Sequence, residues 1–311
     1  MIIKPITDNV LLKKLSTVSK DGMTVFMLYD GIARGSVFHG TRFVNKMRVQ
    51  HKLGILETLA LGHAVLCSAL LIPMMKGRER ILFRCNTDGP LTGFSTEAFS
   101  EGFVRGYLLQ NPIPLTRELP GWELKPLFGN GTISVTRFIE GGKEPVTGVT
   151  EIKHKNIALD LSEYFLQSEQ TVTGFNTGIQ FDKSGRVIGA GGMCIQLMPY
   201  QENKNTEYEQ SVKEIERAFS AAPSFGQWFA EGNNREDIVF GLFRSCKPQL
   251  LIERHIDFSC PCSAENFRNK LLALPKQERD DMYKNGSDPI ELYCHNCGSV
   301  YTYPKNILKL E

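Results

Sequence analysis

The sequence lacks an excess of charge of either sign. Its 36 lysine and arginine residues stand against 34 aspartate and glutamate residues, which leaves a formal net charge of +2. A chain so close to neutrality has no overall electrostatic attraction for nucleic acid or for an anionic membrane. We therefore expect neither of these partners unless a local patch of charge supplies the attraction.

The N-terminus lacks the uninterrupted apolar segment and the small-residue cleavage site of a secretory signal. The most apolar stretch, residues 59–75, is interrupted by Gly62, His63 and Pro73. It is also shorter than the roughly 20 residues that a membrane-spanning helix needs. This stretch predicts a buried helix, and the chain as a whole predicts a cytoplasmic protein without a membrane partner.

Signatures of nucleotide chemistry and of catalysis are also missing. Residues 35–42 have the spacing of a phosphate loop but lack the lysine that reaches the β- and γ-phosphates. Residues 189–192 lack the third glycine of a dinucleotide fingerprint and lie in strand-like sequence, which favours a tight bend. Because no catalytic grouping of serine, histidine and acid stands out, we expect no nucleotide partner and no enzyme activity.

What the chain does contain predicts an α+β core domain with a substantial sheet and packed helices, over residues 1–199. Hydrophobic residues make up 41% of the sequence and charged residues 23%, as in ordinary globular proteins. Asp160, with Glu163 three residues later, is typical of a helix start. The other predicted elements are a helix over 54–73, strands near 81–85 and 127–139, and a hairpin over 178–199 that turns near 182–185.

Residues 200–255 differ in composition and predict a helical linker. Thr206 and Glu209 form a second helix-start pattern in polar sequence. The segment also carries the aromatic residues Phe225, Trp228 and Phe229. This mixture favours a linker that packs on another surface through its aromatic side chains, followed by a small domain over residues 256–311.

The eight cysteines fall into two classes. Four stand alone in apolar or mixed segments, where a cysteine is usually a small buried hydrophobic residue: Cys67, Cys85, Cys194 and Cys246. The other four form two tight pairs separated by 31 residues, Cys260-Pro-Cys262 and Cys294-His-Asn-Cys297-Gly. Four thiolates at this spacing predict a closed tetrahedral site for one zinc ion, with no position left for a catalytic water.

Two histidines lie near these cysteines, but four thiolates already fill a tetrahedral site, so His255 and His295 are expected not to bind the metal. A domain of some fifty residues buries little surface, and structural zinc contributes on the order of 10–16 kcal/mol to folding. Loss of the metal should therefore unfold residues 256–311. Spacing alone also allows a static zinc ribbon that only stabilises the domain.

Two other function classes remain as alternatives. A zinc ribbon that binds nucleic acid should carry a basic surface, yet residues 260–311 contain seven basic and seven acidic residues. A thiol–disulfide oxidoreductase should have its Cys-x-x-Cys at the start of a helix. Here Cys294 and Cys297 lie between two strand-like segments.

With these motifs in view, the chain resembles the thirty-three-kilodalton chaperonin family, the redox-regulated heat-shock chaperones. The resemblance rests on the two cysteine pairs and on several segments of the core: DGP at 88–90, LFGNGTISVT at 127–136, SEYFLQSEQ at 162–170 and AGGMCIQLMP at 190–199. It covers nearly the whole chain.

The resemblance implies an ATP-independent holdase, a chaperone that binds unfolding client proteins. In such a protein the reduced, zinc-bound form is inactive. Oxidation would pair Cys260 with Cys262 and Cys294 with Cys297, release the zinc ion and expose a client-binding surface. Phe225, Trp228 and Phe229 would contribute to that surface, or else serve only in core packing. A homodimer on activation is a further implication.

Overall fold

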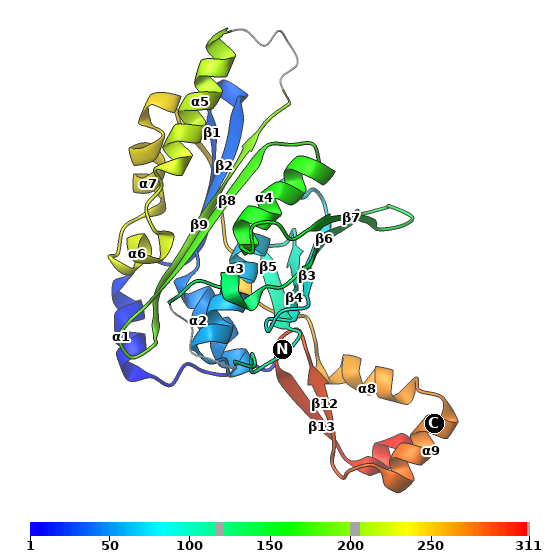
Figure 1. Cartoon of the computed structure of the whole chain (residues 1–311). Coiled ribbons are helices and arrows are strands. Elements are labelled where there is room, and N and C mark those ends of the chain that lie inside the picture. Colours follow the sequence, from blue (N-terminus) through cyan, green and yellow to red (C-terminus); the bar gives the residue numbers. More distant parts are fainter. Residues whose placement is uncertain (116–120, 200–205, 310–311) are drawn as a thin grey trace.

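The computed structural model describes residues 1–115, 121–199 and 206–309. Three sheets organise the chain, with strand orders β10-β1-β2-β9-β8, β11-β5-β4-β3-β6-β7 and β12-β13 (Figure 1). Only the pairing of β11 with β5 is parallel among the described strands. The strands are β1 (Gly22–Leu28), β2 (Ala33–His39), β3 (Arg80–Thr87), β4 (Gly93–Phe99), β5 (Phe103–Leu108), β6 (Gly131–Phe138), β7 (Val146–Glu151), β8 (Thr173–Phe181), β9 (Val187–Leu197), β10 (Gln249–Arg254), β11 (Asp257–Phe258), β12 (Ile290–Cys294) and β13 (Ser299–Tyr303).

Helices cover both large sheets, which confirms the predicted α+β class. The helices are α1 (Asn9–Thr17), α2 (Thr41–His51), α3 (Ile55–Leu70), α4 (Ile157–Ser168), α5 (Thr206–Ser220), α6 (Phe225–Ala230), α7 (Arg235–Leu242), α8 (Ala264–Leu272) and α9 (Lys276–Asn285).

The predicted apolar helix is α3, and it lies at the centre of the main core. Its sequence is apolar all round, as expected for a helix that packs on every side. The segment Ile55–Met74 is long and apolar enough to cross a membrane by length and composition, but 83% of its apolar 18-residue window is buried inside the protein. The two large sheets, α2 and α4 supply the surfaces that bury it.

A second apolar core lies on the other face of the first sheet, beneath α5, α6 and α7. It is built by side chains from β1, β2, β9 and these helices, with Phe26, Phe225, Phe229 and Phe243 fully buried. Close backbone contact holds α6 in place, because a Cβ at Gly189 would lie 2.0 Å from the carbonyl oxygen of Gly226.

This packing corrects the tight bend predicted at residues 189–192, which form the straight interior of β9. Gly191 is needed for a similar reason, since a Cβ there would lie 2.4 Å from the ring of Phe229. Glycine in the middle of this strand therefore lets a helix approach closely.

Two other local features differ from what the sequence suggests. Residues 41–51, for which no element was predicted, form α2. The Thr41 hydroxyl accepts from the backbone nitrogen of Ala190, and the Asn45 amide donates to the carbonyl oxygen of Val187, both on β9. Asp160 was predicted as an N-cap, whereas Asn156 caps α4. Asp160 is instead buried in the first turn, where its carboxylate accepts backbone hydrogen bonds from Lys153, His154 and Asn156.

The hairpin over 178–199 is confirmed as β8 and β9, with its turn at Asp182 and Gly185. Helix α5 begins at Thr206, so the predicted start of the linker at residue 200 lies outside the described residues. After the helices, β10 joins the edge of the first sheet beside β1, which sequence patterning did not predict.

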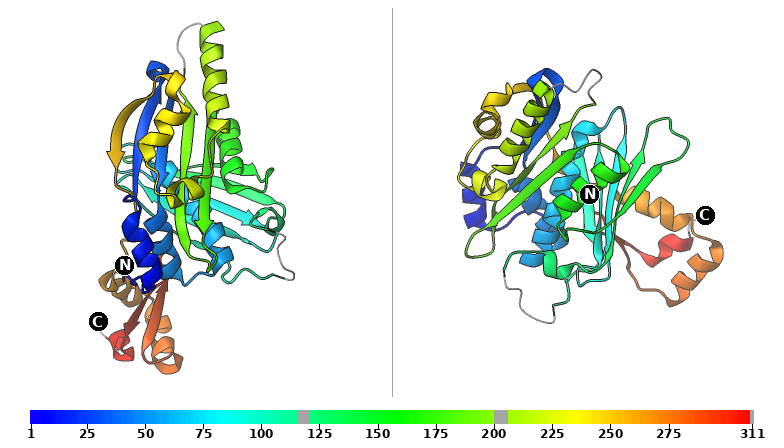
Figure 2. Two further views of the ribbon diagram at one scale, coloured as in Figure 1. Left: turned by 90° about the vertical axis from the view of Figure 1, so that its left-hand side faces the viewer. Right: turned by 45° about the horizontal axis from the view of Figure 1, so that its top comes forward.

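The last fifty residues form a small unit of α8, α9 and the β12–β13 hairpin, which projects from one end of the molecule (Figures 1 and 2). Its own apolar cluster has six buried members: Leu271, Ile290, Tyr301, Tyr303, Ile307 and Leu308. The cysteines Cys260, Cys294 and Cys297 belong instead to the main core cluster. The cysteines thus lie where the small unit meets the rest of the protein.

Candidate metal centre

Two turns bring the paired cysteines together. Cys260 and Cys262 lie between β11 and α8, and Pro261 between them restricts the backbone. Cys294 ends β12, and Cys297 lies in the turn that leads into β13. The amide of Gly298 donates to the carbonyl oxygen of Cys294 over 2.8 Å, and the positive φ of Gly298, 66°, closes the turn.

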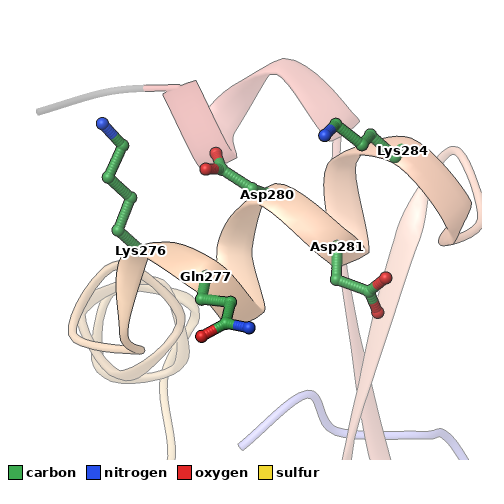
Figure 3. Close-up of a pocket in the computed structure, with 5 residues that line it drawn as sticks. All are labelled: Lys276, Gln277, Asp280, Asp281 and Lys284. Carbon is green, nitrogen blue, oxygen red and sulfur yellow. The ribbon is translucent and has the colours of Figure 1, made fainter.

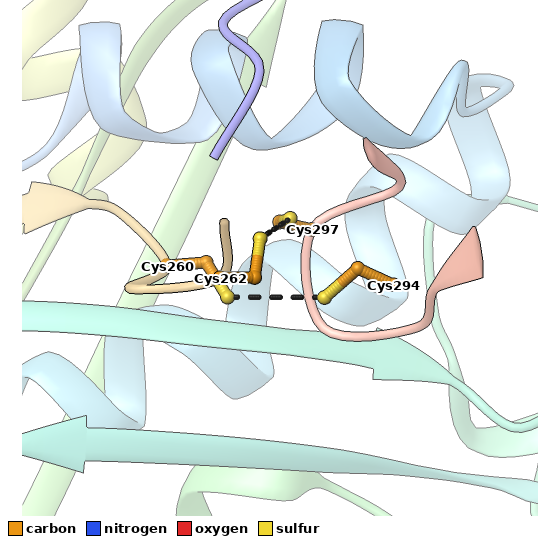
Figure 4. Close-up of side chains that lie close together, drawn as sticks. All are labelled: Cys260, Cys262, Cys294 and Cys297. Atoms are coloured by element: carbon orange, nitrogen blue, oxygen red, sulfur yellow. Dashed lines mark hydrogen bonds between the residues drawn. The ribbon is translucent and has the colours of Figure 1, made fainter. Parts of the chain in front are cut away.

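The four sulfur atoms all lie within 4.8 Å of one another. Figure 4 shows the four side chains pointing toward a common centre, with Sγ–Sγ distances of 3.9 Å for Cys260–Cys294 and 3.4 Å for Cys262–Cys297. A tetrahedral zinc ion with Zn–S bonds of about 2.3 Å has sulfurs about 3.8 Å apart. The residues present therefore fit a zinc ion.

The charge of the cluster also calls for a cation. Hydrogen bonds from Cys294 and Cys297, and after them from Arg105, lower the pKa of Cys260 well below its usual value. The pKa values of the partner thiols Cys294 and Cys297 are raised instead, mainly by their hydrogen bonds with Cys260. A cation at the centre of the cluster would stabilise the thiolate form of these sulfurs.

The core contributes one charged contact to this cluster. Arg105, on β5, donates from Nη1 to Sγ of Cys260 over 3.4 Å. Its Nε donates to Glu97 of β4 over 2.8 Å, and both side chains are 15% exposed. Next to it, the amide of Gly106 donates to the carbonyl oxygen of Asn296 over 3.1 Å. Strand β5 therefore holds both cysteine turns.

The C-terminal hairpin supplies two hydroxyl groups. The Tyr301 hydroxyl lies 3.2 Å from Sγ of Cys262 and donates to the carbonyl oxygen of Cys262 over 3.0 Å. The Ser299 hydroxyl lies 3.2 Å from Sγ of Cys297. Such contacts orient metal ligands and tune their basicity.

Sequence patterns did not reveal Arg105, Glu97 or Tyr301 as site residues. Arg105 is 155 positions away from Cys260 along the chain, and its strand has an ordinary alternating pattern. Tyr301 follows Cys297 closely in the sequence, but this spacing does not indicate a contact with a thiol.

The two histidines near the cysteines lie outside the cluster. Among the described residues, the group of possible ligands at this site consists of the four cysteines alone. His295 is exposed, with its ring between Tyr107 at 5.7 Å and Tyr293 at 5.4 Å. The Cys294–Cys297 turn joins two strands and does not open a helix, which disfavours a thioredoxin-like redox site.

The solitary cysteines are buried, as predicted. Burial raises the pKa of Cys67 and of Cys85 to about 12, and it also raises the pKa of Cys194 and Cys246. Such thiols are poor nucleophiles and poor metal ligands at neutral pH.

The linker aromatics belong to the second core, whereas Cys260, Cys294 and Cys297 belong to the main core. Phe225 and Phe229 are fully buried under α6, and the Phe229 ring stacks on His39 of β2 with centroids 4.3 Å apart. Trp228 is partly buried and donates from its indole nitrogen to the carbonyl oxygen of Asn234. In this state the three side chains serve in packing.

Two surface hollows differ in their relation to the site. The hollow on α9 in Figure 3 is lined by Lys276, Gln277, Asp280, Asp281 and Lys284, and its balanced charges and open shape favour no ligand. The second is a cleft of about 670 Å³ between the second sheet and α8. Cys262 and Cys294, one cysteine of each pair, are among the residues that line this cleft.

Comparison with known proteins agrees with this arrangement. The sequence profile described as "Hsp33 protein" matches residues 21–304. The "33 kDa chaperonin" of Ruminiclostridium cellulolyticum is 31% identical over 277 residues, covering 86% of this chain and 91% of the relative. The "33 kDa chaperonin" of Bacillus subtilis is 28% identical over 291 residues, covering 93% of this chain and 97% of the relative.

A solved structure shares the fold. The crystal structure of the 33 kDa chaperonin, a heat shock protein 33 homolog, from Thermotoga maritima superimposes with a TM-score of 0.83 at 26% identity. The match covers 94% of this chain and 97% of that chain. The resemblance seen in the sequence is therefore confirmed, and the chain belongs to the Hsp33 family of heat-shock chaperones.

Proposed function

We propose that this heat-shock chaperone is a redox-regulated, ATP-independent holdase whose reduced form binds one zinc ion per chain and is inactive. The observation that carries the proposal is the cluster of four sulfurs within 4.8 Å, placed where the small C-terminal unit meets the core. A change in the bonding of these sulfurs would alter the junction between the small C-terminal unit and the core. The cluster can therefore act as a sensor as well as a structural link.

Cys260, Cys262, Cys294 and Cys297 would hold the zinc ion. Bound zinc keeps such sulfurs ionised and close together, and thiolates are the form that oxidants attack. Cys262 and Cys294 line the open cleft, so peroxide can approach one sulfur of each pair.

Oxidation would pair Cys260 with Cys262 and Cys294 with Cys297. Each pair of thiolates gives two electrons to one molecule of hydrogen peroxide, which also takes up two protons from the solvent. One S–S bond forms, the O–O bond breaks, and two water molecules leave. Paired sulfurs no longer serve as thiolate ligands, so the chain releases its zinc ion.

Loss of the cluster would loosen the linker by releasing the strands β11 and β10, which lie just before Cys260 in the chain. Strand β11 ends at Phe258, which is fully buried, and β10 lies just before it at the edge of the first sheet. Since three consecutive apolar side chains of β10 are already exposed, Leu250, Leu251 and Ile252, this edge has little burial to hold it. Its release would free α5–α7 to separate from the first sheet.

We divide the chain accordingly into a core domain (1–199), a linker (200–255) and a redox-switch domain (256–311). Separation of α6 would expose Phe225 and Phe229 together with Trp228, which makes these residues candidates for contact with unfolded clients. A homodimer on activation and a cytoplasmic location belong to the same proposal, which includes no nucleic-acid, membrane or nucleotide partner.

The test compares reduced protein with protein treated with peroxide at mildly raised temperature. We expect one zinc per chain and no suppression of aggregation before treatment. After treatment we expect loss of zinc, loss of four thiols and suppression of aggregation of a heat-denatured test protein. Peptide mapping identifies the disulfide partners. A reduced, well-folded protein without zinc, or aggregation suppression that does not change on oxidation, would overturn the proposal.

A further inference from the structure

The turn that carries Cys297 is seated on the C-terminal end of α2. A Cβ at Gly298 would lie only 2.4 Å from the carbonyl oxygen of Gln50, so no larger residue fits there without movement. The backbone of this turn therefore lies directly on the end of a core helix, 247 positions away from Cys297 in sequence.

The side chain of Gln50 joins three segments of the chain. It is fully buried, and its amide nitrogen donates to the carbonyl oxygens of Ile2 over 2.9 Å and of Cys297 over 3.1 Å. Its amide oxygen accepts from the backbone nitrogen of Lys4 over 2.6 Å. A buried amide with these three partners fixes their relative positions.

Residues 2–4, which we call the N-terminal arm, complete the arrangement. The Lys4 ammonium donates to the carbonyl oxygen of Gly298 over 2.9 Å and also to that of Gln50. The backbone nitrogen of Ile2 donates to the Ser299 hydroxyl over 3.0 Å. The arm therefore contacts Gly298 and Ser299 directly. It is linked to Cys297 through the side chain of Gln50, which bonds both Ile2 and Cys297.

Polar contacts hold residues 2–4 in place, while the side chain of Met1, just before them, packs partly buried against the main core. Ile2 is 47% exposed and Ile3 is 66% exposed, so neither side chain anchors the arm. The family profile matches from residue 21, which leaves the arm outside the matched residues. A segment held by a few hydrogen bonds opens more easily than a packed helix.

We propose that Gln50 and Lys4 are positioning residues for Cys297: they hold the Cys294–Cys297 turn so that its sulfurs meet Cys260 and Cys262, and they set how readily this turn opens. The second half of this statement rests on the proposed redox function. A disulfide requires sulfurs about 2.05 Å apart, so the turn must change shape when it is oxidised. Hydrogen bonds to the carbonyl groups of Cys297 and Gly298 oppose that change.

The experiment replaces Lys4 by Met, which keeps the apolar stem and removes the ammonium group. In reduced, zinc-loaded protein we expect amide exchange at residues 297–300 to accelerate about tenfold, the effect of losing one or two hydrogen bonds from a charged donor. Peroxide-triggered zinc release, followed with a chromophoric chelator, should accelerate by a similar factor. Lys4→Arg, which can still donate, should restore much of the wild-type behaviour.

The control is Lys13→Met, at an exposed position of α1, which should leave both rates unchanged. A second variant, Gln50→Glu, keeps the acceptor for the Lys4 amide but removes both donors, and should act in the same direction as Lys4→Met. Wild-type exchange and zinc-release rates in folded Lys4→Met protein would overturn the proposal. If peroxide releases no zinc from the wild type, the redox function fails, while exchange in reduced protein still decides the positioning role.

Discussion

Burial separates the eight thiols into two chemical classes. The pKa of Cys67 and Cys85 rises to about 12 because both are desolvated, and the same cause raises the pKa of Cys194 and Cys246. Their thiolate fraction at neutral pH is therefore very small. Oxidant should react with the clustered cysteines first.

We predict that the switch survives without the four solitary cysteines. A variant with alanine at positions 67, 85, 194 and 246 should lose roughly 1 kcal/mol of stability per site, because small buried groups are removed. Peroxide should still release its zinc and start aggregation suppression, at rates close to those of the wild type. Thiol counting and zinc release measure this, and a folded variant that no longer responds to peroxide would show the assignment to be wrong.

At the same scale, the sequence reveals the cysteine cluster but not its surroundings. Four thiols with a short spacing inside each pair point to one centre because neighbouring residues cannot lie far apart. Arg105 and Gln50 reach the cluster from distant strands and helices, across 155 and 247 positions. Their roles depend on tertiary packing, which no local pattern records. The prediction of Asp160 as an N-cap was wrong for the same reason. Its hydrogen-bond partners, the backbone nitrogens of Lys153 and His154, lie before the helix that contains Asp160.

Among the elements, helix α6 is held in part by aromatic contacts. Phe229 is fully buried against β9 and stacks on His39. We predict that Phe229→Ala lowers stability by about 3–5 kcal/mol, the usual cost of removing a buried phenyl ring. Because α6 would separate more readily, this variant should suppress aggregation partly without oxidant.

The matched control for that prediction is Phe240→Ala on α7, since Phe240 is 46% exposed. It should change stability by well under 1 kcal/mol and leave the reduced protein inactive. Urea unfolding and aggregation assays measure both effects. Equal behaviour of the two variants would show that the packing of α6 does not restrain the chaperone.

Acid should also weaken this helix contact, through His39. Burial, followed by the charges of Arg235 and Arg42, lowers the pKa of His39 to about 3, whereas an unfolded histidine titrates near 6.5. Between these values the unfolded chain binds a proton that the folded chain does not. The stability contributed by neutral His39 is thus present above pH 6.5 and is lost as pH falls toward 3.

We therefore predict that His39→Gln flattens the pH dependence of the urea midpoint between about pH 6 and pH 4 relative to the wild type. At neutral pH the variant should be less stable by about 1–3 kcal/mol, because the hydrogen bonds with Ser19 and Thr41 are disturbed. Parallel midpoint curves for the two proteins would rule out His39 as the source of acid sensitivity.

The elements differ in how well sequence predicts them. Helix α3 and the β8–β9 hairpin carry strong signals, an apolar run and a turn between alternating segments. Helix α2 was not predicted, although it contains good helix formers such as Lys46, Met47 and Arg48. Tertiary hydrogen bonds to β9 and to the arm, which no local pattern records, help to fix it. Strand β10 is short and becomes a strand only because β1 offers a free edge.

On the scale of the whole molecule, the structure consists of a large body with two apolar cores and a small unit joined to it at the cysteines. The large core lies between the two sheets and around α3. The small unit has six buried apolar or aromatic residues of its own for some fifty residues of chain. Each buried side chain contributes roughly 1.5–3 kcal/mol, while ordering each residue costs about 1–2 kcal/mol. The small unit therefore needs another source of stability.

We predict that this source is the metal, and that Cys294→Ser unfolds residues 264–303 while the core persists. Structural zinc contributes on the order of 10–16 kcal/mol, about as much as the burial of the whole cluster of six side chains. Zinc content should fall below one per chain, and amide exchange in α8, β12 and β13 should become fast. Exchange in α3 and in β8–β9 should stay slow, because their burial does not depend on the cysteines.

His295→Ala, one position away at an exposed site, is the control and should leave zinc content and exchange unchanged. If Cys294→Ser kept wild-type protection in the hairpin, packing against the core would suffice to fold the small unit, and loss of zinc could not be the event that opens the protein.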